Sequence, residues 1–310
     1  MKYIGIHTQQ RRNNTKSIFL LFMFPALLIG LVYLFFVIIS WQNVDSNIDA
    51  GEATLHALPV VLIVVTIWFF IAYFVNTMLI QYATHAAPLE RRDNKRVYNL
   101  VENLCMASGM DMPKVNVIED QSLNAFASGI NKKTYTVTLT RGIINTLDDL
   151  ELEGVIAHEL THIRNRDVRL LIVSIIFVGI FTAIAQIATR IAFHSSSNRS
   201  SSKNSGAGTA VMLLIVAALG IIGYIFSLLI RLSISRKREY MADAGAAQMT
   251  KNPHALADAL RKISRNPVIQ SIKREDIAQL YIEHKAKGAF SGLFATHPPI
   301  EHRIAILEQF

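Results

Sequence analysis

Two histidines stand one helical turn apart in the segment HELTH at 158–162. If this segment is helical, both imidazoles project from one face and can occupy two corners of a tetrahedral zinc site. Zinc lowers the pKa of a bound water to about 7, and an adjacent carboxylate can accept the proton as the water attacks a carbonyl. The motif therefore predicts a zinc peptidase, with His158 and His162 as ligands and Glu159 as general base.

A third ligand is expected further along the chain, because two histidines and a glutamate form a common catalytic zinc set that leaves the fourth position open. In RKREYMADAGAA, Glu239 and Asp243 lie four residues apart and so share one helix face. Glu239 is the natural third ligand, and Asp243 can accept the free N–H of a zinc histidine. The spacing leaves a second interpretation open, in which Glu239 is a solvated residue paired with Arg236 or Arg238.

The elements that must position these residues include apolar helices. The chain has 310 residues, of which 51% are hydrophobic, and a mean hydropathy of +0.32, so an ordinary soluble domain is disfavoured. Four stretches each have close to the ~20 apolar residues that cross ~30 Å of hydrocarbon. They are Ile18–Ser40, Leu58–Ile80, Leu170–Phe193 and Ala210–Ile230. Four runs of this length would overfill any soluble core, and the first is too long for a cleaved signal peptide, so four transmembrane helices are predicted.

Basic residues cluster beside these stretches, whereas the connector 41–57 has no Lys or Arg. This pattern predicts that both termini and the catalytic residues are cytoplasmic, and that the formal charge of +8 faces lipid headgroups and not nucleic acid. The predicted order is a cytoplasmic tail (1–17), a transmembrane hairpin (18–81), a first catalytic part (82–168), a second hairpin (169–231) with a Ser-rich outer loop (194–209), and a second catalytic part (232–310).

The two catalytic parts are expected to form one domain of helices and short strands. The single cysteine, Cys105, excludes an internal disulfide framework. The predicted elements are an amphipathic helix at Pro88–Ala107 that is stopped by Gly109, strands at KVNVIED and TYTVTLT around the turn GINKK, a helix through His162 capped by Thr146 with Asp149, and helices that begin at Pro253 and at Pro298.

With these residues assembled, the sequence resembles the HtpX family of membrane-bound zinc metalloproteases, relatives of the CAAX prenyl proteases. The motifs SLNAFASG, AHELTHIRNRD, REYMADAGAA and LFATHPPIEHRI stand in that family's order, and the similarity covers nearly the whole chain. The resemblance implies a membrane α-helical protein with a mainly α, α+β catalytic domain of the zincin (gluzincin) type. It also implies one zinc ion per chain, held by His158, His162 and Glu239, with Glu159 as base and Asp243 in support.

By the same resemblance, Asn124 lies on an edge strand that pairs with substrate backbone, and His297 stabilises the developing oxyanion. Asn124 can instead form a turn, and His297 can instead cap the helix at Pro298. The expected function is hydrolysis of misfolded or damaged membrane proteins at the cytoplasmic membrane. Two other interpretations stay open: a processing protease for a lipidated or signal-type peptide, and a non-enzymatic membrane scaffold with a structural zinc.

Overall fold

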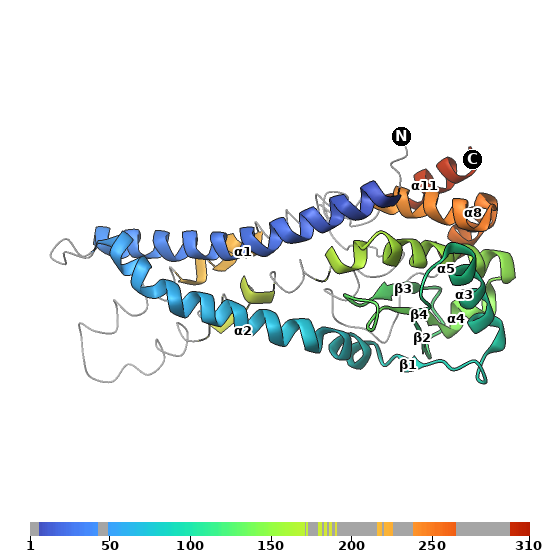
Figure 1. The fold of residues 1–310 in the computed structure, drawn as a ribbon, viewed down its shortest axis with the longest axis horizontal. Coiled ribbons are helices and arrows are strands. Elements are labelled where there is room, and N and C mark those ends of the chain that lie inside the picture. Colours follow the sequence, from blue (N-terminus) through green and yellow to red (C-terminus); the bar gives the residue numbers. More distant parts are fainter. Residues whose placement is uncertain are drawn as a thin grey trace. The chain divides into compact units, whose positions relative to one another are not determined.

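The computed structural model describes residues 6–42, 49–170, 172, 179–181, 183–184, 186–187, 190, 216–218, 220–225, 238–264 and 298–310. These residues form two compact units (Figure 1). The mixed unit holds the described residues of 1–16, 75–172 and 232–310, and the apolar unit holds those of 17–74 and 173–231. Each unit is described by itself.

Two long helices supply most of the described apolar unit. They are α1 (Ile6–Gln42) and α2 (Ala50–Thr84), and each contains a stretch long and apolar enough to cross a bilayer, Arg11–Ser40 and Ala50–Ile71. Only 11% and 6% of these stretches are buried, whereas a core helix of a soluble protein is mostly buried. Their exposed apolar side chains therefore fit a lipid surrounding. The third and fourth predicted spans lie largely, and the loop 194–209 wholly, outside the described residues.

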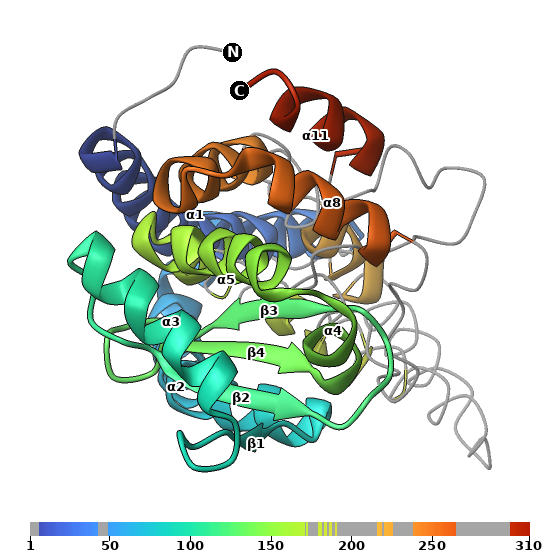
Figure 2. The same cartoon turned by 90° about the vertical axis from the view of Figure 1, so that its right-hand side faces the viewer.

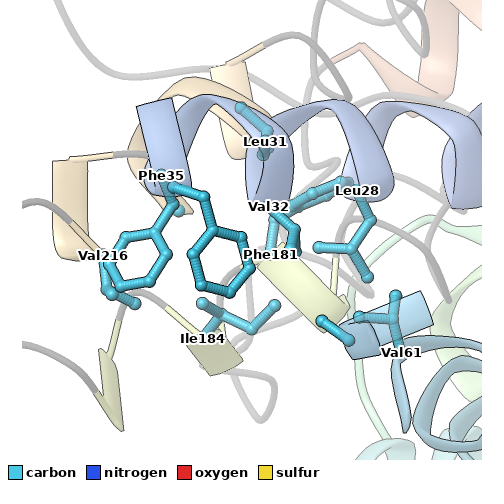
Figure 3. A pocket seen from close by; sticks show the side chains of 11 residues that line it. Leu28, Leu31, Val32, Phe35, Val61, Phe181, Ile184 and Val216 are labelled. Atoms are coloured by element: carbon cyan, nitrogen blue, oxygen red, sulfur yellow. The ribbon is translucent and has the colours of Figure 1, made fainter. Parts of the chain in front are cut away.

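The apolar unit contains a partly open apolar pocket of about 320 Å³ (Figure 3). Leu28 and Phe35 of α1, Val61 of α2, and Phe181 line it together with further apolar residues. Phe181 also contacts Phe24 of α1, with 6.4 Å between the ring centroids. Around this pocket, the described residues of the unit contact each other through apolar side chains, as is common between helices in a membrane.

A four-stranded sheet forms one layer of the mixed unit, in the order β1-β2-β4-β3. Its strands are β1 (Ala87–Pro88), β2 (Lys114–Ile118), β3 (Ala125–Ser128) and β4 (Thr136–Thr140). β2 and β4 are parallel, and β1 and β3 are antiparallel to their neighbours. Within the described part of the chain, β3 pairs on one side only, so it is an edge strand.

The predicted strands at 114–120 and 134–140 are present as β2 and β4. They are parallel neighbours, so a tight turn does not connect them. The turn GINKK joins β3 to β4. Gly129 in this turn has φ 104°, and a Cβ there would lie 2.3 Å from the carbonyl oxygen of Thr134. The strand pattern missed β3 because AFAS is short and has no β-branched residue.

The helix α3 (Lys95–Ser108) begins later than the sequence predicted. Asn94 caps it by accepting a hydrogen bond from the N–H of Val97, and Pro88 belongs to β1, so the prediction of a helical start at Pro88 was wrong. The predicted stop is confirmed, because Gly109 ends the helix in the left-handed conformation at φ 64°.

Helices stack above the sheet in layers (Figure 2). After α4 (Arg141–Thr146), the helix α5 (Asp149–Arg164) packs on β3 and on α3. Above it, α8 (Pro253–Ile263) packs on α5, and α11 (Ile300–Leu307) packs on α8. Residues 238–250 are also helical. α5 contributes Leu152, Val155, Ile156 and Leu160 to the core, and all four are fully buried.

The single cysteine, Cys105, lies buried in α3. Burial, with the nearby charge of Asp111, raises the pKa of its thiol to about 11, so the thiolate that reacts with alkylating dyes is nearly absent at neutral pH. Unfolding of the mixed unit exposes this one thiol. Its reaction therefore reports the unfolding temperature of the mixed unit.

Candidate metal centre

The first two predicted ligands lie on α5, whose start is fixed by a capping box. Asp148 accepts a hydrogen bond from the N–H of Glu151, and Glu151 accepts one from the N–H of Asp148, both at 2.9 Å. Lys262 of α8 pairs with Glu151 at 2.6 Å and ties the cap to the next layer. The predicted cap at Thr146 was wrong by two residues, because Thr146 still belongs to α4.

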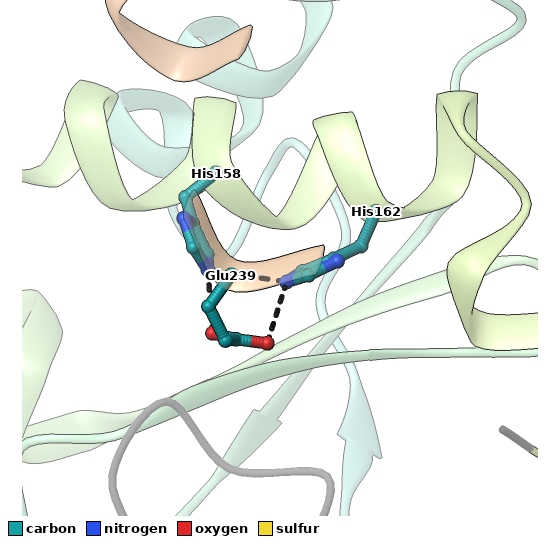
Figure 4. Close-up of side chains that lie close together, drawn as sticks. All are labelled: His158, His162 and Glu239. Carbon is teal, nitrogen blue, oxygen red and sulfur yellow. Dashed lines mark hydrogen bonds and ion pairs between the residues drawn. The ribbon is translucent and has the colours of Figure 1, made fainter. Parts of the chain in front are cut away.

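The two histidines of α5 meet a carboxylate from the helical segment 238–250 (Figure 4). The Nε2 atoms of His158 and His162 lie 3.2 Å apart. Each lies 3.6 Å from a carboxylate oxygen of Glu239. His158 and Glu239 are buried, and His162 is partly exposed. The structure thus brings together the three residues that the sequence proposed as ligands.

The spacing of these donor atoms fits a metal ion. Ligand atoms about 2.0–2.1 Å from a tetrahedral zinc are separated from each other by about 3.3 Å, close to the 3.2–3.6 Å found here. Two imidazole lone pairs and a carboxylate are all acceptors, and they do not form hydrogen bonds with each other. Their burial side by side is unfavourable unless a positive charge binds between them. Burial lowers the pKa of His158, but hydrogen bonds with Asp243 and Glu239 more than offset this and raise it to about 9, so the place favours positive charge.

A carboxylate holds the second ring nitrogen of each histidine. The Nδ1 atom of His158 lies 2.9 Å from Asp243, as predicted, and the Nδ1 atom of His162 lies 3.1 Å from Asp167. With Nδ1–H donated to a carboxylate, the lone pair of Nε2 faces the other donors. The sequence interpretation missed Asp167, although it ends the motif AHELTHIRNRD five residues after His162.

Arg303 of α11 is a further residue of the centre that the sequence interpretation missed. Its guanidinium donates to both oxygens of Asp243, at 2.9 and 2.7 Å, and lies 3.6 Å from Glu239. The side chain is 1% exposed. Burial lowers the pKa of Arg303, but the charge of Asp243 more than offsets this and raises it, so Arg303 stays protonated. The same pairing lowers the pKa of Asp243 to about 2, although burial alone would raise it.

The proposed base, Glu159, is 3% exposed and faces the edge strand. Burial raises the pKa of Glu159, and the charges of His158 and His162 partly oppose this shift. The main-chain N–H of Ala127 in β3 donates a hydrogen bond to its carboxylate. A carboxylate with a raised pKa beside the ligand cluster is suited to accept and return a proton near neutral pH.

The remaining predicted site residues are Asn124 and His297. Asn124 directly precedes β3 and is fully buried. Its carbonyl oxygen accepts a hydrogen bond from the main-chain N–H of Thr140, and its own N–H donates to the side-chain hydroxyl of Thr140. Its side-chain oxygen accepts from the N–H of Ala125 at 2.8 Å. His297 lies outside the described residues. The described chain resumes at Pro298, directly before α11 and Arg303.

The helical segment that carries Glu239 approaches α5 closely at Gly245. A Cβ at this position would lie 2.3 Å from the Cγ2 atom of Thr161 on α5. We expect Gly245→Ala to push the two helices apart at a cost of about 1–3 kcal/mol and to weaken metal binding, because Glu239 moves with its helix. The unfolding temperature from the Cys105 reaction, together with metal affinity by chelator competition, tests this.

The matched control for that variant is Gly245→Ala combined with Thr161→Ala, which removes the two atoms nearest to the new methyl group, Cγ2 and Oγ1 of Thr161. This double variant is expected to regain most of the stability lost in the single one. If the single variant has wild-type stability and metal affinity, the close approach of the two helices does not position the site.

Comparison with known proteins agrees with this geometry. The family model for Peptidase family M48 matches residues 91–310. The "Protease HtpX homolog" of Bacteroides fragilis is 57% identical over 324 residues and covers 100% of both chains. The proteins of the same description from Dictyoglomus thermophilum and Listeria monocytogenes are 39% and 35% identical, covering 76% and 88% of this chain and 77% and 93% of their own.

Among solved structures, the crystal structure of S. mikatae Ste24p matches with a TM-score of 0.48 and 20% identity, over 97% of this chain and 66% of that one. The predicted resemblance to the HtpX family is confirmed by the curated relatives, and a metal-dependent protease is the activity that this family implies. The chain belongs to peptidase family M48 and is a metalloprotease of the HtpX type.

Proposed function

We propose that this metalloprotease is a zinc-dependent endopeptidase of the cytoplasmic membrane that cleaves misfolded or damaged membrane proteins. The observation that carries the proposal is the convergence of two imidazole nitrogens and a carboxylate, 3.2–3.6 Å apart, beside the buried Glu159. The apolar and mostly exposed helices α1 and α2 support a place in the membrane.

In this proposal His158, His162 and Glu239 hold one zinc ion per chain. Two histidines with one carboxylate favour zinc over magnesium or calcium, which prefer oxygen ligands. Three protein ligands leave the fourth position open, as in catalytic zinc sites, whereas structural sites have four. A zinc ion held by these residues would supply a Lewis acid that polarises the peptide carbonyl and lowers the pKa of a bound water. Glu159 accepts the proton of the attacking water and passes it to the leaving amine.

The substrate is an extended segment of polypeptide that pairs with β3. This strand has a partner on one side only within the described residues, and its Ala127 N–H reaches the carboxylate of Glu159. A peptide added to that edge passes next to the base. Pairing through main-chain hydrogen bonds does not depend on the sequence of the substrate, but it requires an unfolded segment. Both properties suit an enzyme that removes misfolded proteins. Asn124 shapes the start of this edge, and His297 is proposed to stabilise the oxyanion.

We also propose the topology drawn from the charge pattern, with two transmembrane hairpins at 18–81 and 169–231 and the catalytic parts at 82–168 and 232–310 in the cytoplasm. α1 and α2 support the first hairpin. Substrates in the membrane would then be met at their cytosolic segments.

The test is metal content and cleavage by the detergent-purified full chain. We expect about one zinc per chain by elemental analysis, and cleavage of an unfolded membrane protein at least about ten times faster than of its folded form, at many bonds. Cleavage of a single bond in one peptide would instead support a processing protease. Zinc without any peptide hydrolysis would support the scaffold.

A further inference from the structure

The carboxylate of Asp167, which holds His162, is itself held by the first helix of the chain. One oxygen of Asp167 faces the Nδ1 atom of His162 at 3.1 Å. Its other oxygen accepts a hydrogen bond from the side-chain amide of Asn13 on α1, at 2.6 Å. The same amide nitrogen donates to the carbonyl oxygen of Asn165 at 2.8 Å. We propose that Asn13 is a positioning residue for the metal ligand His162 and acts through Asp167.

The orientation of Asn13 is set by its partners, which are a carboxylate and a carbonyl oxygen. Both are acceptors, so only the NH₂ group of the amide fits between them. Asn13 is 1% exposed and Asp167 is 2% exposed, so water does not replace this contact. The two N–H groups of one buried side chain thus connect the end of α5 to the carboxylate that orients His162.

The turn that carries Asp167 needs such support, because its backbone is strained. Arg166, between the two partners of Asn13, has φ 61°, in the left-handed region that residues with a side chain rarely adopt. Such conformations persist where surrounding contacts fix them. Asn13 binds the residues on both sides of Arg166, and Arg238 donates to the carbonyl oxygen of Asp167 at 3.1 Å. Arg238 directly precedes the third proposed ligand, Glu239.

The two histidines are therefore supported in different ways. Asp243 behind His158 is paired with a cation, Arg303, and a charged pair resists displacement. Asp167 behind His162 has its second oxygen on the neutral amide of Asn13. The position of His162 then depends on the N-terminal part of α1, which lies in the mixed unit, whereas the support of His158 comes from the C-terminal helix.

This inference rests on the proposed role of His162 as a zinc ligand, so the quantity measured in its test is zinc affinity and not the rate of hydrolysis. The full chain is loaded with zinc in detergent, and the dissociation constant is measured by chelator competition. We expect Asn13→Ala to raise the constant about tenfold, and Asp167→Ala to raise it roughly 10- to 100-fold. The double variant is expected to have nearly the zinc affinity of Asp167→Ala alone, because the effect of Asn13 on His162 passes through the carboxylate of Asp167.

Two controls separate positioning from folding. Asn14→Ala changes the next residue of α1, which is half-buried, and is expected to leave zinc affinity unchanged. The Cys105 reaction shows whether each variant is folded. Asn13→Asp keeps the size of the side chain but replaces the donor with an acceptor; it is expected to weaken zinc binding more than Asn13→Ala, and to change the visible absorption of the cobalt-substituted protein.

A wild-type dissociation constant in folded Asn13→Ala or Asn13→Asp would overturn the inference, as would additive effects in the double variant. Either result would leave the proposed zinc site intact. If His162→Ala does not weaken zinc binding, the proposed site and this inference fail together.

Discussion

Replacement of Glu159 by glutamine is expected to lower peptide hydrolysis by roughly 10²–10⁴-fold while the protein keeps its full metal content. Glutamine has nearly the same shape, and it still accepts the hydrogen bond from the N–H of Ala127. It cannot accept a proton from water. The three proposed ligands are untouched, so metal analysis and cleavage of an unfolded protein separate the base from the ligands.

The matched control is Glu153→Gln, on the same helix and half-buried, at a position away from the ligand cluster. It is expected to keep wild-type activity. Hydrolysis by Glu159→Gln within a few-fold of the wild type would mean that another group accepts the proton. Loss of metal together with activity would make Glu159 a residue of the metal site itself.

A second large effect is expected at Arg303. Replacement by methionine keeps much of the side-chain volume but leaves Asp243 buried without its cation, which costs about 3–5 kcal/mol. The unfolding temperature of the mixed unit, read from the Cys105 reaction, should fall by roughly 6 °C or more. Metal affinity should fall as well, because Asp243 orients His158.

Arg261→Met is the control for this variant, because Arg261 is an exposed residue that pairs with Asp258 and Glu308. Exposed ion pairs contribute about 0–1 kcal/mol, so little change is expected. Addition of Asp243→Asn to Arg303→Met removes the unpaired charge and should restore part of the stability. Wild-type stability of Arg303→Met would show that solvent reaches Asp243 and that the pair does not support the site.

The residues of the centre that are close in sequence could be predicted from it, because helix geometry places them. His158 and His162 are one turn apart, and so are Glu239 and Asp243; each pair shares a face whatever the rest of the chain does. The sequence left open whether Glu239 joins the two histidines or is a solvated residue, because helical spacing does not show which element a helix face contacts. The distances of 3.2–3.6 Å between the two Nε2 atoms and the carboxylate of Glu239 show that the two faces meet.

The other supports could not be predicted from local patterns. Arg303 reaches Asp243 across 60 residues, and Asn13 reaches Asp167 across 154. Neither has a periodic signal, because a buried polar contact depends on two distant backbone positions. The errors in the predicted helix starts were local. The structure caps α3 at Asn94, several residues after the predicted start, and α5 at Asp148, two residues after the predicted cap, because these side chains accept hydrogen bonds from the first turns of the two helices.

The ionic support behind His158 joins parts of the chain that are synthesised at different times. Asp243 and Glu239 are made well before Arg303, and until that arginine arrives the buried carboxylates lack their cation. A nascent chain that already has HELTH and the first apolar helices in place therefore has an incomplete centre. The ionic support behind His158 is therefore completed only when α11 docks, after the ligands themselves have been synthesised.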